Sequence, residues 1–382
     1  MQATVTQEIE QMKKMVKSFV DNEVEPYAQQ IEDEDKIPDH LVEQAKDLGL
    51  FGISIPEEYG GIGLNAVGKA VVLEQLGHTH NGFVSLISAH TGIGSTGLVK
   101  LASEQLKQKY LPDMAAGKKI AAFALSEPGA GSDATNLATR AEKRGNQWIL
   151  NGTKHFITNA PVADVFTVFA LTDKEKGAKG GITAFLIEKD FPGFMLGKKD
   201  KKMGLRGSHT AQLIFEDCVV PEENVIGEVG MGYMSALKIL SEGRVGLAAR
   251  AVGSCDKLIA LSASYAKERI QFGKPIADNQ AIQWMLADMA TETEAARTLT
   301  YMAASMIDEG KKVIKEASMA KLFASDVFNR VADKAVQIHG GMGYVSDYPV
   351  ERFYRDARIT KIYEGTNEIQ RLIIARRVLE EN

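Results

Sequence analysis

The sequence predicts an α+β protein that is mostly α-helical, with a β region between two helical regions. Three observations support this plan. Apolar residues follow a helical period up to about residue 118, short β-forming runs come next, and the helical period returns from about residue 232 to the end. A chain of 382 residues exceeds one ordinary core, so we expect three domains, at 1–118, 119–231 and 232–382.

The first region is predicted to be all-helical. Near the N-terminus, apolar residues recur at three- and four-residue steps with charged residues between them, namely at Val5, Ile9, Met12, Val16, Phe19 and Val20. Further helices are expected around 40–49, 65–77 and 95–115, because segments rich in Pro and Gly, such as 55–63, separate these stretches.

The middle region is predicted to form a small antiparallel β-barrel or sandwich. Runs rich in β-branched and aromatic residues occur at 120–125, 147–150, 165–171, 182–187 and 212–219. Turn-forming residues separate the runs, as at 144–146 and at Asn151 and Gly152.

The last region is predicted to form an antiparallel bundle of four helices. Apolar residues keep a helical period over long stretches there, from Ile282 to Met306 and from Ile314 to Ile338. Long amphipathic helices that follow one another in a chain pack well in this way.

Composition and charge exclude several classes of protein. A net charge of −5 opposes nucleic acid as the main partner, because phosphate binding depends on Lys and Arg. No apolar run reaches the roughly 18 residues of a membrane span, and the N-terminus lacks the layout of a signal peptide, so we expect a cytoplasmic protein. The two distant cysteines fit neither a disulfide framework nor a zinc site, and no metal is expected.

Two segments of the β region could surround a ligand. Small residues at 123–133, with the hydroxyls of Ser126 and Ser132, suit a phosphate or pyrophosphate. The segment 151–159 places Phe156 beside amide and hydroxyl groups, where a flat ring could bind. Taken alone, a plain Gly-rich turn and a hairpin followed by a core aromatic explain these two segments more simply.

Three segments of the last region carry candidate functional residues. The segment 269–275 combines a guanidinium, an amide and an aromatic ring, and three glycines lie within four residues at 340–343, where they could admit a ligand or end a helix. Glu364 lies before Gly365, in the loop ahead of the last predicted helix. Burial against apolar surface would raise the pKa of Glu364 and make it a base near neutral pH, whereas a solvated loop glutamate is the simpler interpretation.

In combination, these segments resemble the acyl-CoA dehydrogenases, flavoproteins that introduce a 2,3-double bond into acyl-CoA thioesters. The resemblance covers essentially the whole chain, and its short- or short-branched-chain, bacterial-like type fits best. It rests on the segments FALSEPGAGSD (123–133), NGTKHFITN (151–159), KMGLRGSHT (202–210), RIQFGKPI (269–276), QIHGGMGY (337–344) and IYEGTNEIQR (362–371).

The resemblance implies a role for each matching residue. Glu364 matches the catalytic base, which takes the α-proton while the β-hydrogen leaves as hydride to the flavin of FAD. Contacts with FAD are implied for Phe123, Leu125, Ser126, Gly131, Ser132, Phe156, Ile157, Thr158, Thr366, Asn367 and Glu368. Contacts with the FAD of a neighbouring subunit are implied for Arg269, Gln271, Phe272, Gln280, Gln337, Ile338, Gly340 and Gly341. Substrate contacts are implied for Ser132, Ser241, Glu242, Gly243, Arg244 and Gly365.

Three positions depart from the family pattern. Phe156 stands where many members carry Trp, and Ser241 where short-chain members commonly carry Asp. Isovaleryl- and long-chain members place the base at the position of Gly243, with Glu242 one step away from it here. We therefore retain Glu364 as the base and disfavour those two subtypes.

The sequence thus predicts an oxidoreductase acting on CH–CH groups of a short- to medium- or branched-chain acyl-CoA, in fatty acid β-oxidation or branched-chain amino acid catabolism. The expected electron acceptor is electron-transfer flavoprotein, and the expected assembly is a homotetramer. Two alternatives keep the fold: an acyl-CoA oxidase, which usually has an extra C-terminal domain, and a DNA-binding alkylation-response relative, which is longer and more basic. A purely structural helical protein would leave Glu364 and the Gly-rich segments unexplained.

Overall fold

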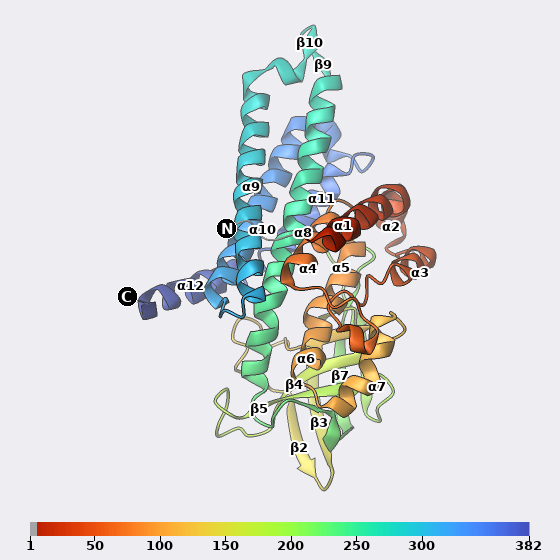
Figure 1. The fold of residues 1–382 in the computed structure, drawn as a ribbon, viewed down its shortest axis with the longest axis vertical. Helices are drawn as coiled ribbons and strands as arrows, with labels where there is room; N and C mark the ends of the chain where they lie inside the picture. The colour runs from red at the N-terminus through yellow and green to blue at the C-terminus, as the bar shows by residue number, and fades with distance from the viewer. Residues whose placement is uncertain (1–5, 382) are drawn as a thin grey trace.

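The computed structural model describes residues 6–381 and places helices first, a β-sheet next and long helices last (Figure 1). This order confirms the predicted fold class. Val5, which the helical period included, lies outside the described residues. Within residues 6–381, no helix is both long enough and apolar enough to cross a membrane.

The first region is helical, as predicted. Its helices are α1 (Gln7–Phe19), α2 (Ala28–Glu34), α3 (Asp39–Asp47), α4 (Ala66–Leu76), α5 (Asn81–Ala89), α6 (Ser95–Leu101) and α7 (Glu104–Ala115). The side chain of Thr6 caps α1 by accepting a hydrogen bond from the Ile9 N–H. Helix α5 was not predicted, because it is only nine residues long and begins with Asn81 and Gly82, which locally indicate a turn. A π-helical turn at His90–Gly94 links α5 to α6.

The middle region is one twisted sheet with mostly antiparallel pairing. Its strands are β1 (Ala121–Ala124), β2 (Arg140–Arg144), β3 (Gln147–Thr158), β4 (Val165–Leu171), β5 (Ile182–Glu188), β6 (Phe194–Lys199), β7 (Thr210–Pro221) and β8 (Val225–Ile226). They lie in the order β6-β7-β3-β2-β4-β5-β8, and β1 adds to β4 in parallel. Strands β2 and β6 escaped prediction because most of their residues are not buried and show no apolar run.

The turn predicted at Asn151 and Gly152 is wrong, because both residues lie inside β3. The register between β3 and β7 shifts between Leu150 and Gly152, which is the mark of a β-bulge. Gly152 has a φ of 146°, and a Cβ at this position would lie 2.6 Å from the Cα of Thr139. The glycine therefore permits a bulge beside a close neighbouring backbone rather than a turn.

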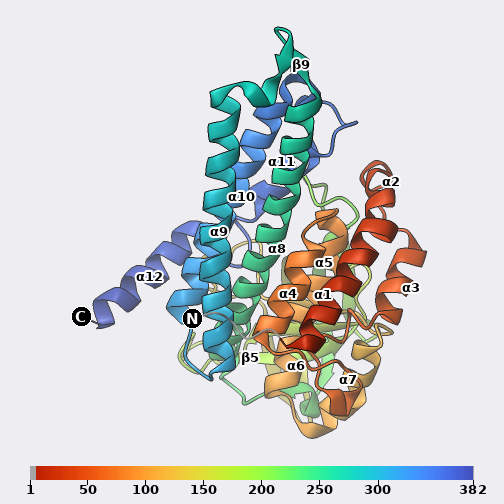
Figure 2. The same ribbon diagram turned by 45° about the horizontal axis from the view of Figure 1, so that its top comes forward.

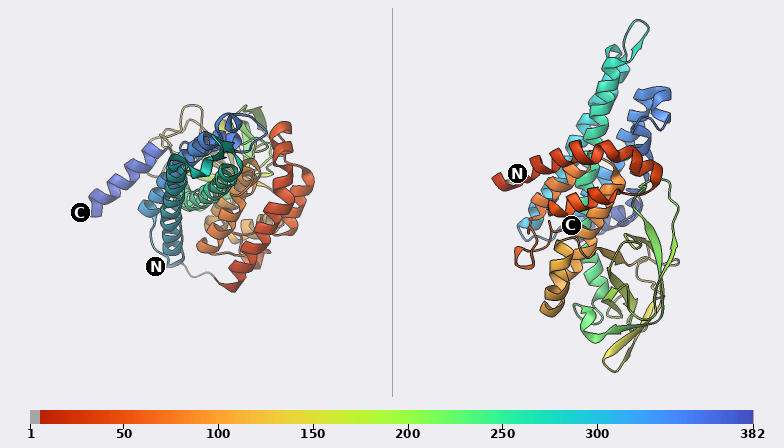
Figure 3. Two further views of the ribbon diagram at one scale, coloured as in Figure 1. Left: turned by 90° about the horizontal axis from the view of Figure 1, so that it is seen from above. Right: turned by 90° about the vertical axis from the view of Figure 1, so that its right-hand side faces the viewer.

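The last region is dominated by α8 (Gly232–Glu268), α9 (Gln280–Asp308) and α10 (Ile314–His339), which pack side by side. The shorter helices α11 (Val350–Ile359) and α12 (Asn367–Glu381) pack on α10, so the predicted helical bundle is confirmed. The hairpin of β9 (Ile270–Gln271) and β10 (Lys274–Pro275) joins α8 to α9 at the tip farthest from the sheet (Figure 3).

The N-terminal helices join the bundle through a close crossing of α4 and α8 (Figure 2). A Cβ at Gly253 would lie 1.9 Å from the carbonyl oxygen of Glu74, and a Cβ at Gly77 would lie 2.3 Å from that of Arg250. Asp308, at the end of α9, accepts hydrogen bonds from the first backbone N–H groups of α4 and fixes that end as well. The backbones of α4 and α8 therefore touch where both residues are glycine.

Gly253→Ala should test this crossing. The added methyl group meets backbone, which cannot move aside as a side chain can, so we expect the free energy of unfolding to fall by about 1–3 kcal/mol. Urea unfolding followed by circular dichroism measures the loss. Gly129→Ala is the matched control, because a Cβ there meets nothing within 4 Å. Equal stability of the two variants would contradict the close crossing.

Candidate active site

A cavity of about 2220 Å³ lies where the sheet, the π-helical turn, α8 and the loop before α12 meet. It brings together most of the residues that the sequence singled out. The predicted residues that line it are Phe123, Leu125, Ser126, Gly131, Ser132, Phe156, Ile157, Thr158, Ser241, Glu242, Arg244, Glu364, Gly365 and Thr366. Gly243 lines a smaller cavity of about 50 Å³ that adjoins the first at Glu364.

The remaining predicted residues do not line either cavity. Arg269, Gln271, Phe272 and Gln280 lie at the α8–α9 hairpin, and Gln337, Ile338, Gly340 and Gly341 lie at the end of α10. Phe272 is fully exposed at the tip. Glu368 is exposed on the first turn of α12, and the buried side chain of Asn367 bonds to Lys321 and Ser325. Roles in cofactor binding for these residues stay predictions.

One wall of the large cavity is anchored by a buried ion pair that sequence reasoning missed. Lys154, on β3, donates to the carbonyl oxygen of Leu125 at 3.0 Å and to Oε1 of Glu127 at 2.7 Å. Glu127 also accepts from the backbone N–H groups of Ala138 and Thr139. Burial raises the pKa of Glu127, but the Lys154 ammonium and these hydrogen bonds outweigh it and hold the pKa below its usual value. The segment 123–133 is thus tied to β3.

The same wall offers the features that a flavin needs. Phe156 lies at the second bulge of β3, with a φ of 59°, and its side chain is 64% exposed. The ring stacks on His155 with centroids 3.9 Å apart, so one aromatic ring supports the other. A Cβ at Gly131 would meet nothing within 4 Å, so the backbone of that segment is open to a ligand. An aromatic surface, hydroxyl groups and accessible backbone fit a flat ring that carries a pyrophosphate.

Glu364 lies in the loop between α11 and α12, and its carboxylate is buried at the junction of the two cavities. Its φ of 54° is unusual for a residue with a side chain. Oε2 has no hydrogen-bond partner in the structure, and Oε1 lies 3.9 Å from Nη2 of Arg250. Burial raises the pKa of Glu364, and the charges of Arg250, Lys321 and Arg244 oppose that rise. Such a carboxylate can act as a base near neutral pH.

The loop that carries Glu364 is held by a lysine that the sequence analysis did not find. Lys321, on α10, donates to the carbonyl oxygen of Gly365 at 2.8 Å and to Oδ1 of Asn367 at 2.9 Å. Burial lowers the pKa of Lys321 to about 8. Gln370 donates to the same Gly365 carbonyl at 2.8 Å. A lysine among the buried alanines of α10 was the available signal, because a buried charge needs a partner.

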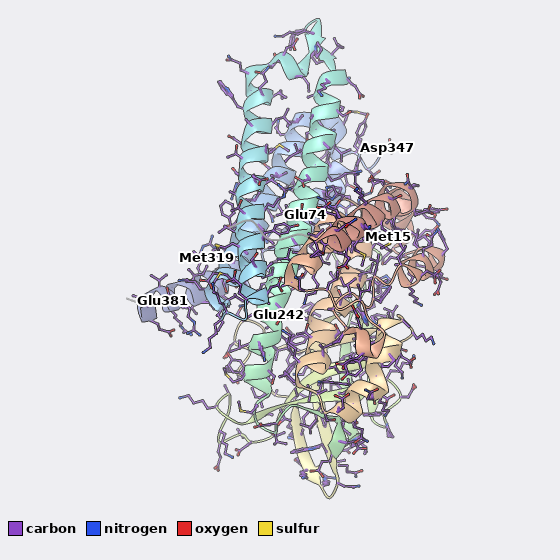
Figure 4. All side chains as sticks on the ribbon, viewed as in Figure 1. Met15, Glu74, Glu242, Met319, Asp347 and Glu381 are labelled. Carbon is purple, nitrogen blue, oxygen red and sulfur yellow. The ribbon has the colours of Figure 1, made fainter. Side chains whose placement is uncertain are left out.

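The α8 residues of the site differ in what they contact. Glu242, labelled below Glu74 in Figure 4, forms ion pairs with Lys69 and Lys100. Ser241 donates to the carbonyl oxygen of Leu237, within its own helix. A Cβ at Gly243 would lie 2.7 Å from Oε2 of Glu364. The absence of a side chain at Gly243 therefore leaves the space that the Glu364 carboxylate occupies.

Comparisons with known proteins identify the family. The chain matches the acyl-CoA dehydrogenase N-terminal domain over residues 6–118, the middle domain over 122–218 and the C-terminal domain over 230–379. An acyl-CoA dehydrogenase of Bacillus subtilis (strain 168) is 47% identical over 98% of this chain and 99% of the relative. The chain belongs to the acyl-CoA dehydrogenase family, as its motifs predicted.

Solved structures support the same assignment. Butyryl-CoA dehydrogenase from Megasphaera elsdenii superposes with a TM-score of 0.96, at 40% identity, over 99% of this chain and all of that one. A chain of the structure described as "Electron transferring flavoprotein of Acidaminococcus fermentans: Towards a mechanism of flavin-based electron bifurcation" gives 0.96, at 44% identity, over 99% and 100%. An acyl-CoA dehydrogenase complexed with FAD from Bacillus anthracis gives 0.92, at 40% identity, over 99% and 68%. The protein is an FAD-dependent oxidoreductase acting on CH–CH groups.

Gly243→Ala should displace the Glu364 carboxylate without unfolding the chain. A methyl group 2.7 Å from Oε2 forces that side chain to move, and a displacement near 1 Å costs about a hundredfold in rate. We expect this loss in the rate at which acyl-CoA bleaches the flavin, with FAD content retained. Gly246→Ala, on the same helix, is the control, because its Cβ meets only the flexible end of Leu73. A Gly243→Ala variant as fast as that control would show that the site tolerates the methyl group.

Proposed function

We propose that this acyl-CoA dehydrogenase converts a short- to medium- or branched-chain acyl-CoA to the trans-2-enoyl-CoA, with Glu364 as the base. The observation that carries the proposal is the state of the Glu364 carboxylate. It is buried where the two cavities meet, and Oε2 lacks any hydrogen-bond partner among residues 6–381. A carboxylate that lines a ligand cavity and has an oxygen without a hydrogen bond is available to accept a proton.

The surroundings of Glu364 match the two demands on such a base. It must be ionised when the substrate arrives, and the charges of Arg250, Lys321 and Arg244 favour that form. It must also be basic enough to remove a proton from carbon, and burial raises its pKa for that purpose. The proton from the α-carbon then goes to the Glu364 carboxylate.

The proposed reaction balances with FAD as the second participant. When bound, FAD accepts the β-hydrogen of the substrate as a hydride. The residues that would hold FAD are Ser126, Ser132, Phe156 and Thr158, which present hydroxyls and an aromatic ring to the cavity. The electron pair of the α-carbon–hydrogen bond becomes the new double bond, and the burial of Glu364 limits its contact with water.

The space beside Glu364 supports a short acyl group. The cavity that adjoins the base has a volume of about 50 Å³ and lies between α4, the π-helical turn and α8. An acyl tail that passes the base in this direction meets the charged side chains of Lys69 and Glu242 as well as apolar ones. The similarity to a butyryl-CoA dehydrogenase points the same way. Fatty acid β-oxidation or branched-chain amino acid catabolism would supply such substrates.

We further propose that electrons pass to electron-transfer flavoprotein and that the protein is a homotetramer. The first point is supported by the similar chain in the Acidaminococcus fermentans flavoprotein structure. The second is supported by the exposure of Ile270 and Phe272 at the hairpin tip, which lies at the end of the molecule away from the sheet (Figure 1). In a tetramer, this tip and Gln337–Gly341 would reach the FAD of a neighbour. Light scattering on the holoenzyme measures the mass of the assembly.

An anaerobic titration of the holoenzyme tests the function and the substrate together. Butyryl-, isobutyryl-, 2-methylbutyryl-, isovaleryl-, octanoyl- and palmitoyl-CoA are added in turn while the flavin absorbance is followed. We expect one or two of the shorter substrates to bleach the flavin rapidly. Electron-transfer flavoprotein should then restore the absorbance much faster than air does. Fast reoxidation by air would indicate an oxidase, and failure of all six substrates would refute the proposed substrate class.

Glu364→Gln should retain the flavin and lose α-proton abstraction, because an amide is isosteric with the carboxylate but is not a base. We expect bleaching by the preferred substrate to fall by about a hundredfold to ten-thousandfold, which is the range for loss of a general base. Glu242→Gln is the matched control, since it changes a neighbouring carboxylate that already pairs with Lys69 and Lys100. Near wild-type bleaching by Glu364→Gln, or a greater loss in Glu242→Gln, would sink the assignment of the base.

A further inference from the structure

Arg250 is a buried arginine on α8 whose hydrogen-bond partners are neutral. Its side chain is 8% exposed. Nη1 donates to Oγ of Ser88 at 3.1 Å, and Nη2 donates to Oη of Tyr363 at 2.7 Å. Within residues 6–381, the carboxylate that lies at ion-pair distance from this guanidinium is that of Glu364, at 3.9 Å. This distance is too long for a hydrogen bond, so the two charges interact through space.

The two oxygens of Glu364 therefore have different surroundings. Oε1 faces the Arg250 guanidinium, whereas Oε2 faces the gap left by Gly243 and has no partner. A buried charge without a partner is costly, and the interaction at Oε1 compensates both Arg250 and Glu364. Because Arg250 stops short of a hydrogen bond, it favours the ionised carboxylate without occupying either oxygen.

Arg250 also holds the backbone next to the base. Tyr363 directly precedes Glu364, and its hydroxyl is bound by Nη2 of Arg250 while the guanidinium carbon lies 5.2 Å from the centre of its ring. Glu364 has a left-handed backbone conformation, which persists only if its neighbours are fixed. Lys321 fixes the residue after the base, and Arg250 fixes the residue before it.

We propose that Arg250 is a positioning residue for the base: its guanidinium holds Tyr363 and keeps the Glu364 carboxylate charged, ready to take the substrate proton. This inference rests on the proposed role of Glu364. Arg250 lies outside the motif segments of the family and does not contact the substrate carbon atoms. Its removal should change the pH range over which Glu364 is ionised.

The effect of Arg250 on the pKa of Glu364 has to be compared with the effects of the other titratable groups nearby. They are Arg244 and Glu242 on α8, Lys321 on α10, Lys69 on α4, and the phenol of Tyr363 on the same loop. Arg250 opposes the effect of burial on the Glu364 pKa more than Lys321 or Arg244 does. A raised pKa means that the carboxylate is lost as the pH falls through it, so removal of Arg250 must extend that loss to higher pH.

The first test is the pH dependence of anaerobic flavin bleaching in Arg250→Gln. We expect the acidic limb of the profile to move to higher pH by about one pH unit or more, the size typical for loss of an opposite charge near 4 Å. Arg250→Lys keeps a positive charge and should return most of the shift. Arg297→Gln is the control, because it removes a partly buried arginine that pairs with Glu74 and Asp256 instead. An Arg250→Gln midpoint equal to that of wild type and control would overturn the proposal.

A second measurement does not depend on turnover. Infrared difference spectra of the holoenzyme across pH show the protonated carboxyl band of Glu364, which is identified by its loss in Glu364→Gln. The titration midpoint of this band should rise in Arg250→Gln and stay in place in Tyr363→Phe, which removes the 2.7 Å hydrogen bond but keeps the charge. Tyr363→Phe should instead lower the maximal bleaching rate. An unmoved band in a folded Arg250→Gln would refute the electrostatic role.

The same measurements separate this inference from the proposed function. If Arg250→Gln does not fold, Tyr363→Phe still tests the contact, and a wild-type maximal bleaching rate in that variant would overturn the positioning role. If no acyl-CoA bleaches the wild-type flavin, the proposed function fails while the infrared titration still reports whether Arg250 sets the charge of Glu364. Bleaching that depends on Glu364 but not on Arg250 would leave the function standing and remove the inference.

Discussion

The active site depends on keeping one buried carboxylate charged. Glu364 is desolvated by its cavity walls, and without compensation its carboxylate would take up a proton and could not serve as the proposed base. Compensation comes from two helices, with Arg244 and Arg250 on α8 and Lys321 on α10. These guanidinium and ammonium groups are themselves buried. The negative carboxylate therefore offsets the cost of burying them, just as their positive charges offset the cost of burying the carboxylate. The loop before α12 is thereby attached to the bundle by the same charges that tune the base.

A buried ion pair also stabilises the wall of the cavity formed by the β-sheet, where it anchors the irregular segment 123–133. A ligand that lies against backbone requires an irregular segment, and an irregular segment needs an anchor. The Lys154–Glu127 pair supplies it by satisfying the Leu125 carbonyl and two backbone N–H groups around the Gly-rich segment. The bulges of β3 then turn Phe156 out of the sheet and into the cavity. Buried charge on both walls therefore holds non-regular backbone in place.

The sequence was sufficient to predict the elements with a regular apolar pattern and the site residues that belong to family motifs. Long amphipathic helices such as α10 follow from periodicity, and strands β4 and β5 follow from continuous apolar runs. Helix α5 is too short to show a clear period, and strand β2 is mostly exposed. Motif residues such as Ser126, Phe156 and Glu364 were found to share a cavity. The sequence analysis missed Lys154, Lys321 and Arg250. Charged residues are usually exposed, and the sequence alone does not show that these three are buried beside partners distant in the chain.

The crossing of α4 and α8 connects the packing of the chain to its chemistry. The carbonyl oxygen of Arg250 is the atom that a Cβ at Gly77 would strike, so the backbone of Arg250 lies in the helix contact itself. Its side chain leaves that contact toward Ser88 on α5 and Tyr363 beside the base. A displacement of α4 would therefore move the guanidinium relative to Glu364 through rigid helix. The guanidinium is held 3.9 Å from the carboxylate by its hydrogen bonds to Ser88 and Tyr363, while its backbone is fixed in the helix contact. Tight packing of small residues in the helix contact thus fixes the backbone that carries the arginine nearest the Glu364 carboxylate.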